Sequence, residues 1–110
     1  MVGSVNVSGT ITTGNACALR YWKITGTTPT TGTNADYSLP SGVVFTNVVA
    51  AYGGVYNPHF MPFNNSRNDT TGDAGWKCSF YISNGNKVNM SVAGVNTGSV
   101  PFVLIIVTIA

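Results

Sequence analysis

Apolar and polar residues alternate most regularly between residues 76 and 93. Every second residue from Trp76 to Ser83 is apolar, and the alternation resumes from Lys87 to Ala93 after the turn sequence Asn84-Gly85-Asn86. Strict alternation is typical of a strand with one buried face, and an Asn-Gly turn between two such strands indicates a β-hairpin. The sequence therefore predicts two antiparallel neighbouring strands here.

The register of this hairpin follows from its two faces, because a shift by one residue would move every apolar side chain to the solvent side. A two-residue loop would place Ile82 opposite Lys87, an apolar residue opposite a charge. We therefore predict a three-residue loop, with Asn86 in the left-handed conformation that such loops use. The residues paired by this loop are Ile82 with Val88, Phe80 with Met90, Cys78 with Val92 and Ser83 with Lys87.

The rest of the chain divides into short apolar runs separated by Gly, Pro, Asn and Thr, which predict further strands and turns. The run 43–52 is apolar on both faces except at Thr46 and Asn47, which indicates a buried strand with a bulge near Asn47. Gly53-Gly54 is expected to end it. The run 102–109 is apolar on both faces as well, which suits a central strand buried in a sandwich or between subunits. Other strands are expected at 2–12, 16–25 and 37–39, with a loop at 26–34.

These elements amount to about seven or eight strands with frequent turns, the pattern of an antiparallel β-sandwich or a jelly-roll-like knob. The composition agrees, because Glu and Gln are absent while Val, Ile, Thr, Tyr and Phe are plentiful. No internal repeat or linker interrupts the sequence. Residues 1–110 are therefore expected to form one all-β domain, either complete or as the C-terminal fragment of a longer protein.

Charge is scarce, since only 7% of the residues are charged, compared with roughly 25% in an average soluble domain. Such a surface is expected where much of it is buried in an oligomer, or where an uncharged polar surface contacts sugars outside the cell. The five basic residues are scattered, which argues against nucleic acid as a partner. No apolar run approaches the roughly 18–20 residues of a membrane span, and the first residues lack a signal-peptide pattern. We expect neither membrane insertion nor a signal peptide.

Catalytic and metal-binding chemistry finds little support in the sequence. For the one histidine, His59, we favour a structural or surface role over ligand contact or catalysis, because no G-x-S-x-G nucleophile motif accompanies it. The stretch 68–73 lacks the alternating carboxylates and terminal Glu of a calcium loop. We therefore expect no enzyme activity, no metal and no cofactor. Cys17 and Cys78 could form a disulfide, but synthesis in the cytoplasm favours two free thiols.

Polar and aromatic residues gather in and around the stretch 53–75. Aromatic rings beside Asn, Asp and Arg are suited to sugars, since rings cover C–H faces and polar groups bind hydroxyls, and loops often carry function. The opposing interpretation is that Phe60, Met61 and Phe63 belong to the core and that the polar loop is only solvated. The candidate ligand-binding residues are Tyr52, Tyr56, His59, Asn64, Asn65, Arg67, Asp69, Asp73 and Trp76.

Three further patterns follow one another between Gly26 and Ala110. They are the turn Leu39-Pro40-Ser41-Gly42, the hairpin that begins with Tyr81-Ile82, and the run 96–102, which leads into the apolar final strand. With these patterns the chain resembles the C-terminal tip, or knob, domains of bacteriophage and prophage tail-fibre and tail-needle proteins. The resemblance implies a homotrimeric sandwich or jelly roll that is entered from an upstream fibre shaft. It transfers no binding residue, because the loops of such tips vary most.

The function implied by this resemblance is attachment of a virion to its host. A trimer on the virion tail would bind a glycan or an outer-surface protein of the host cell, after synthesis in the bacterial cytoplasm without a signal peptide. In such a trimer the second apolar face of the final strand would pack on a sibling subunit. Two alternatives stay open. One is a structural virion protein without a ligand, such as a capsid decoration or fibre-folding cap, and the other is a monomeric carbohydrate-binding module.

Overall fold

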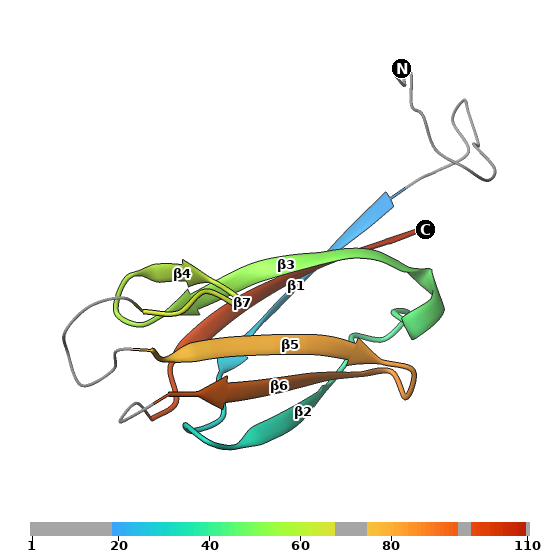
Figure 1. The fold of residues 1–110 in the computed structure, drawn as a ribbon. Helices are drawn as coiled ribbons and strands as arrows, with labels where there is room; N and C mark the ends of the chain where they lie inside the picture. Colours follow the sequence, from blue (N-terminus) through green and yellow to red (C-terminus); the bar gives the residue numbers. More distant parts are fainter. Residues whose placement is uncertain (1–18, 68–74, 95–97, 110) are drawn as a thin grey trace, which may run out of the picture.

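The computed structural model describes residues 19–67, 75–94 and 98–109, and these form an all-β fold of two antiparallel sheets (Figure 1). The strand predicted at 2–12 lies outside the described residues, as do Cys17, Asp69 and Asp73. The larger sheet has the order β1-β7-β3-β4 and the smaller one the order β2-β6-β5. The described elements are β1 (Leu19–Thr27), β2 (Asn34–Ser38), the 3₁₀ helix η1 (Phe45–Asn47), β3 (Val48–Tyr56), β4 (Phe60–Pro62), β5 (Lys77–Ser83), β6 (Lys87–Ala93) and β7 (Pro101–Ile109). The sandwich expected from the sequence is thereby confirmed.

The hairpin of β5 and β6 has the predicted register. Ile82 pairs with Val88 and Cys78 with Val92, and Ser83 meets Lys87 beside the three-residue loop. Asn86 has a φ of 62°, the left-handed conformation expected for it. Its side-chain Oδ1 accepts a hydrogen bond of 2.7 Å from the backbone N–H of Phe45, so the loop also anchors η1.

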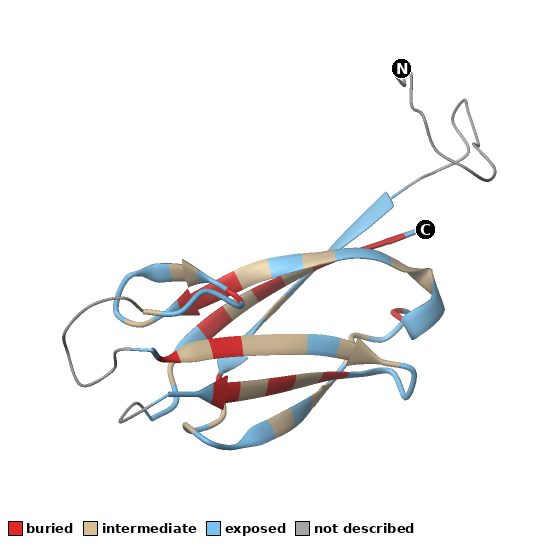
Figure 2. Ribbon diagram, viewed as in Figure 1, coloured by how far each residue is buried: buried red, intermediate tan, exposed pale blue. Residues whose placement is uncertain are grey.

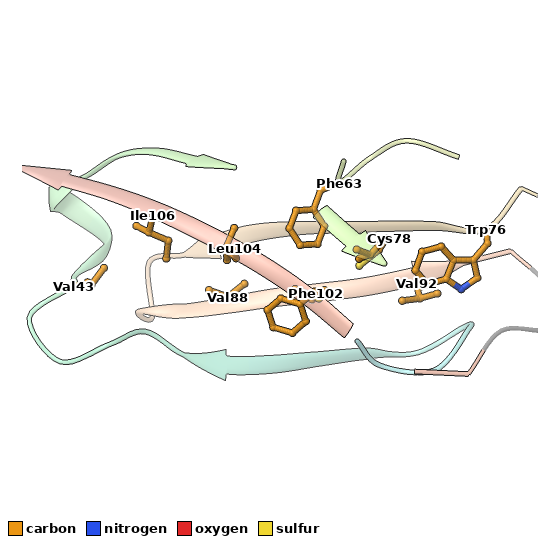
Figure 3. Packing of buried hydrophobic residues seen from close by; sticks show 11 residues of the cluster. Val43, Phe63, Trp76, Cys78, Val88, Val92, Phe102, Leu104 and Ile106 are labelled. Atoms are coloured by element: carbon orange, nitrogen blue, oxygen red, sulfur yellow. The ribbon is translucent and has the colours of Figure 1, made fainter. Parts of the chain in front are cut away.

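The core lies between the two sheets and is built on β7. This strand lies between β1 and β3, which confirms its prediction as a central strand. Its inward residues Phe102, Leu104 and Ile106 are almost fully buried. They face the smaller sheet, where Val88 and Val92 of β6 lie opposite them (Figure 3). Alternation along β6 and β7 therefore supplies the apolar layer that holds the sheets together.

The segment 43–56 differs from its prediction. The expected buried strand is preceded by η1 and starts at Val48, and its register irregularity lies between Val48 and Ala50. The strand is not buried on both faces, because Val49 is 52% exposed. It also continues through Gly53 and Gly54 to Tyr56, rather than ending at the glycines.

Close packing explains why glycines stand inside β3. A Cβ on Gly53 would collide with the backbone carbonyl of Val103 on the neighbouring strand. A Cβ on Gly54 would collide with the carbonyl of Met61 and would lie 2.8 Å from Cζ of Phe60. The two glycines therefore allow close approach of neighbouring groups, a recognised use of glycine within a strand.

Strands β1 and β2 both extend into the predicted loop at 26–34. β1 continues to Thr27, which pairs with Pro101, and β2 begins at Asn34 and ends one residue before Leu39. Gly26 fits under the ring of Phe102, whose Cε2 would lie 3.1 Å from an added Cβ. No helix among the described residues is long and apolar enough to span a membrane.

Candidate functional site

The larger sheet has a second apolar side, which points away from the core. Side chains alternate along a strand, so the odd-numbered residues of β7 point outward. Val107 is buried without belonging to the inter-sheet core, and the register places it between Tyr21 of β1 and Ala50 of β3. We name this outward surface the apolar face; it consists of Leu19, Tyr21, Lys23, Thr25, Ala50, Tyr52, Tyr56, Phe60, Pro62, Val103, Ile105, Val107 and Ile109.

The rings on the apolar face are largely open to solvent. Tyr21 is 67% exposed, Tyr52 is 54% exposed and Phe60 is 53% exposed. Tyr56 and Phe60 form an edge-to-face pair with centroids 5.4 Å apart. Strand β1 is exposed along most of its length (Figure 2). Lys23 is the one charged side chain of this face, which therefore has the composition of an interface rather than of a solvated surface.

The outward side of the smaller sheet has the opposite character. We name it the polar face; it consists of Asn34, Asp36, Ser38, Lys77, Ser79, Tyr81, Ser83, Lys87, Asn89 and Ser91. Tyr81 is its one aromatic residue and is 60% exposed. The two outward sides of the sandwich thus divide the surface into an apolar and a hydrophilic half.

Hydrogen bonds across the strands order the polar face. Asn89 Nδ2 donates to Asp36 Oδ1 over 2.8 Å. The hydroxyls of Ser79 and Ser91 lie 3.3 Å apart. These pairs join β2, β6 and β5, and they fix the directions of polar groups that would otherwise sample several rotamers.

The structure places the ligand-binding candidates of the sequence on several different elements. Tyr52 and Tyr56 lie on the apolar face. His59 is exposed in the turn between β3 and β4, where its carbonyl accepts a hydrogen bond of 3.0 Å from the N–H of Asn57.

The described candidates between β4 and β5 are Asn64, Asn65 and Arg67, and Arg67 contacts the turn that carries His59. Asn64 and Asn65 are exposed, and Asn64 has a φ of 71°. Arg67 is half-buried, and its Nη1 lies 3.5 Å from Oδ1 of Asn57. The candidates Asp69 and Asp73 lie outside the described residues.

The prediction of Trp76 as a ligand-binding residue is wrong. The side chain has no exposed surface and belongs to the inter-sheet core, so it offers no ring to a ligand. The alternation that predicted β5 already placed Trp76 on the same side as Cys78, and a flanking core position is the physical reason for its burial. The opposing interpretation, that Phe60, Met61 and Phe63 belong to the core, holds for Phe63, which is buried against Phe80, and not for Phe60, which is 53% exposed.

The described residues offer little chemistry beyond binding. They contain no group of three or more His, Cys, Asp or Glu side chains that could hold a metal ion. Cys78 is a free, buried thiol, and burial raises its pKa to about 12. A buried thiol with this pKa stays protonated near neutral pH, so the nucleophilic thiolate is not formed there.

Comparisons of the chain with protein-family models, with curated proteins and with solved structures find no match. The residues that stand out on the two faces are therefore the starting point for function. Sequence reasoning missed Tyr21 and Tyr81 as candidates. Alternation could have indicated Tyr81, because it occupies an outward position in a strand that is otherwise polar on that side.

Proposed function

We propose that this chain is a self-associating binding domain, the homotrimeric tip of a bacteriophage tail fibre or tail needle, which contacts a receptor on the host cell and performs no catalysis. The observation that carries the proposal is the apolar face. Soluble monomers rarely expose a contiguous apolar surface of this kind, and large ones mark interaction sites.

In the proposed trimer, three copies turn their larger sheets toward a common axis. The outward residues of β7, centred on Ile105, are flanked by Tyr52 of β3 and Lys23 of β1. Packing this layer against equivalent layers would remove the exposed rings from water, which is the main driving force of association. Most homo-oligomers have closed symmetry, and a threefold axis is the one that the tail-fibre resemblance implies.

A second copy of the chain is favoured over a charged or membrane partner by the composition of the face. Lys23 is its one charge, so no electrostatic match to an anionic or cationic partner is required. A cluster of several basic residues, as needed for an anionic lipid surface, is absent from the apolar face. An identical copy supplies an apolar partner of the same width.

The first test is the solution mass by light scattering after size exclusion. A mass near three times the 11.5 kDa of the chain is expected at micromolar concentration. Tyr52→Glu puts a charge into the proposed interface and should yield monomers. The matched control is Tyr81→Glu, because Tyr81 is an outward tyrosine of similar exposure on the polar face, and this variant should stay trimeric.

A folded monomer for the unmodified chain would contradict the proposed assembly and favour a monomeric carbohydrate-binding module. A trimer that both glutamate variants leave unchanged would place the interface elsewhere. Adsorption of the labelled trimer to candidate bacterial cells tests the receptor-binding half of the proposal. A trimer that adsorbs to no host of a phage carrying this chain would favour a purely structural virion protein.

A further inference from the structure

The two sheets of the sandwich point their outward sides in opposite directions. If the apolar face turns to the axis of the proposed trimer, the polar face becomes the outer surface of the assembly. We propose that this outer surface binds an uncharged sugar unit of a cell-surface polysaccharide, through the row of Tyr81, Asn89 and Asp36. The inference rests on the proposed receptor-binding function and gives it a ligand class and a place.

The row crosses the smaller sheet from edge to edge. Tyr81 of β5 pairs with Asn89 of β6, and Asn89 pairs with Asp36 of β2. Adjacent strands lie about 4.8 Å apart, so the three positions span roughly 10 Å. The row therefore has the dimensions of a short saccharide laid across the strands.

The ring of Tyr81 provides the stacking surface. It is 60% exposed, and none of the close ring pairs among the described residues includes it. An aromatic ring presents an apolar body with a polar tip, which suits a sugar that has a C–H face and hydroxyls at its rim. The neighbours of Tyr81 on this face are polar, so a stacked sugar would find hydrogen-bonding groups around the ring.

Asn89 and Asp36 provide those groups in a fixed arrangement. The 2.8 Å hydrogen bond from Asn89 Nδ2 to Asp36 Oδ1 uses one amide proton and one carboxylate oxygen. Asn89 Oδ1 and Asp36 Oδ2 keep acceptor capacity for sugar hydroxyls, and the second amide proton can still be donated. Hydroxyls that bind a carboxylate make the shorter, stronger class of hydrogen bond.

The charges of the polar face favour an uncharged sugar over an acidic one. Asp36 lies in the row itself and would repel a carboxylate or phosphate on the ligand. The nearest lysine by register, Lys87, directs its Nζ to Ser38 Oγ over 3.3 Å, at the end of the face beside the hairpin loop. An anionic ligand would therefore meet the negative Asp36 within the row, at its β2 end, and would find the nearest lysine only outside the row.

A flat face binds a single sugar weakly, and threefold assembly compensates for this. Three identical sites on one particle can raise the apparent affinity for a repeating polysaccharide by about 10²–10⁴ over a single site. Tip assembly and sugar binding can therefore be separated experimentally, because a monomeric variant keeps the site and loses only the multiplicity.

The test uses the unmodified chain and its variants on a printed array of uncharged and acidic bacterial-surface oligosaccharides, after each solution mass has been measured. The unmodified chain should bind uncharged oligosaccharides. Tyr81→Ala should weaken binding about threefold to tenfold, because stacked rings contribute roughly this much, while Tyr81→Phe should retain most of the affinity. Asn65→Ala, a change in the loop that the sequence favoured, should leave binding unaltered, and Tyr52→Glu should bind through Tyr81 with reduced apparent affinity.

Several outcomes would overturn the inference. They are no binding to any uncharged sugar, binding that Tyr81→Ala leaves unchanged, or binding lost in Asn65→Ala instead. The proposed assembly fails independently, through the mass. A monomer that binds uncharged sugars through Tyr81 would refute the trimer and keep the site, whereas a trimer without sugar binding would do the reverse.

Discussion

The central strand β7 offers a paired test, because Leu104 and Ile105 are neighbours that point to opposite sides of the same sheet. Leu104 is completely buried between the sheets, and Ile105 is half-buried on the apolar face. Replacement by Ala removes three carbons from either side chain. At about 0.8 kcal/mol for each buried carbon, full burial of three carbons corresponds to about 2.4 kcal/mol. Strand propensity falls in both variants, and more so for the β-branched Ile105.

For Leu104→Ala the free-energy cost of the cavity left in the core is added to the transfer term, the lost free energy of burying the three carbons. Core Leu→Ala changes generally destabilise by about 2–5 kcal/mol, and we expect about 3–4 kcal/mol here. For Ile105→Ala in an isolated chain, about half of the transfer term applies and no closed cavity forms, which gives about 1.2 kcal/mol. In the proposed trimer Ile105 is covered by other subunits, and its replacement should destabilise about as much as that of Leu104.

Urea unfolding, followed by tryptophan fluorescence at several protein concentrations, measures both values. The unfolding midpoint of an oligomer rises with concentration, so the assembled state is recognised in the same experiment. A loss below about 1.5 kcal/mol for Leu104→Ala would refute the burial argument for the core. A loss near 1 kcal/mol for Ile105→Ala at every concentration would refute the covering of the apolar face.

Three further predictions concern single positions. Because burial raises the pKa of the Cys78 thiol from 9.0 to about 12, the unfolded chain ionises first, and stability should fall as pH rises from 9.0 toward 12. In a Cys17→Ser background a thiol reagent should accordingly modify Cys78 only in urea, and fast reaction of the folded chain would contradict its burial. Gly54→Ala should destabilise by about 1–3 kcal/mol in thermal unfolding, since the added methyl collides with Met61, and a neutral effect would refute this packing. Asn86→Ala should destabilise by about 1–2 kcal/mol, because it puts Ala in the left-handed region. Asn86→Gly should destabilise less, because it loses only the hydrogen bond to Phe45. Equal losses of stability in the two variants would show that the backbone conformation is unimportant.

The parts of the fold that could be predicted are those where one physical requirement decides the local structure. The β5–β6 register followed from matching Ile82 with Val88 instead of Lys87, because only one register keeps both apolar faces on the same side. The central position of β7 followed from a long run with apolar side chains on both faces of the strand, a pattern that does not suit an edge strand.

The parts that could not be predicted depend on contacts between distant segments. Gly53 and Gly54 are turn signals when only neighbouring residues are considered, but here they lie inside β3, where the carbonyls of Val103 and Met61 leave no space for a side chain. The outward position of Tyr52 on the larger sheet likewise depends on the strand order, whereas the alternation of β5 already placed Trp76 on the core side. A list of aromatic and polar residues in one stretch of sequence does not contain that order, so the list combined a core residue, Trp76, with residues of the apolar face and of the loops.

The few charges of the described residues are divided unevenly between the two sides of the sandwich. On the apolar face a charge would have to be dehydrated by any partner, and Lys23 is the one present. On the polar face, Asp36, Lys77 and Lys87 lie among hydroxyls and amides, and polar pairs such as Ser79 with Ser91 and Asn89 with Asp36 cross the strands. Little electrostatic repulsion then opposes contact between apolar faces, so a free monomer would associate without order unless its geometry defines a closed assembly. The solution mass therefore decides more than stoichiometry. One discrete species requires an interface with a defined geometry, whereas a broad distribution of masses would mean that apolar faces associate without a defined geometry.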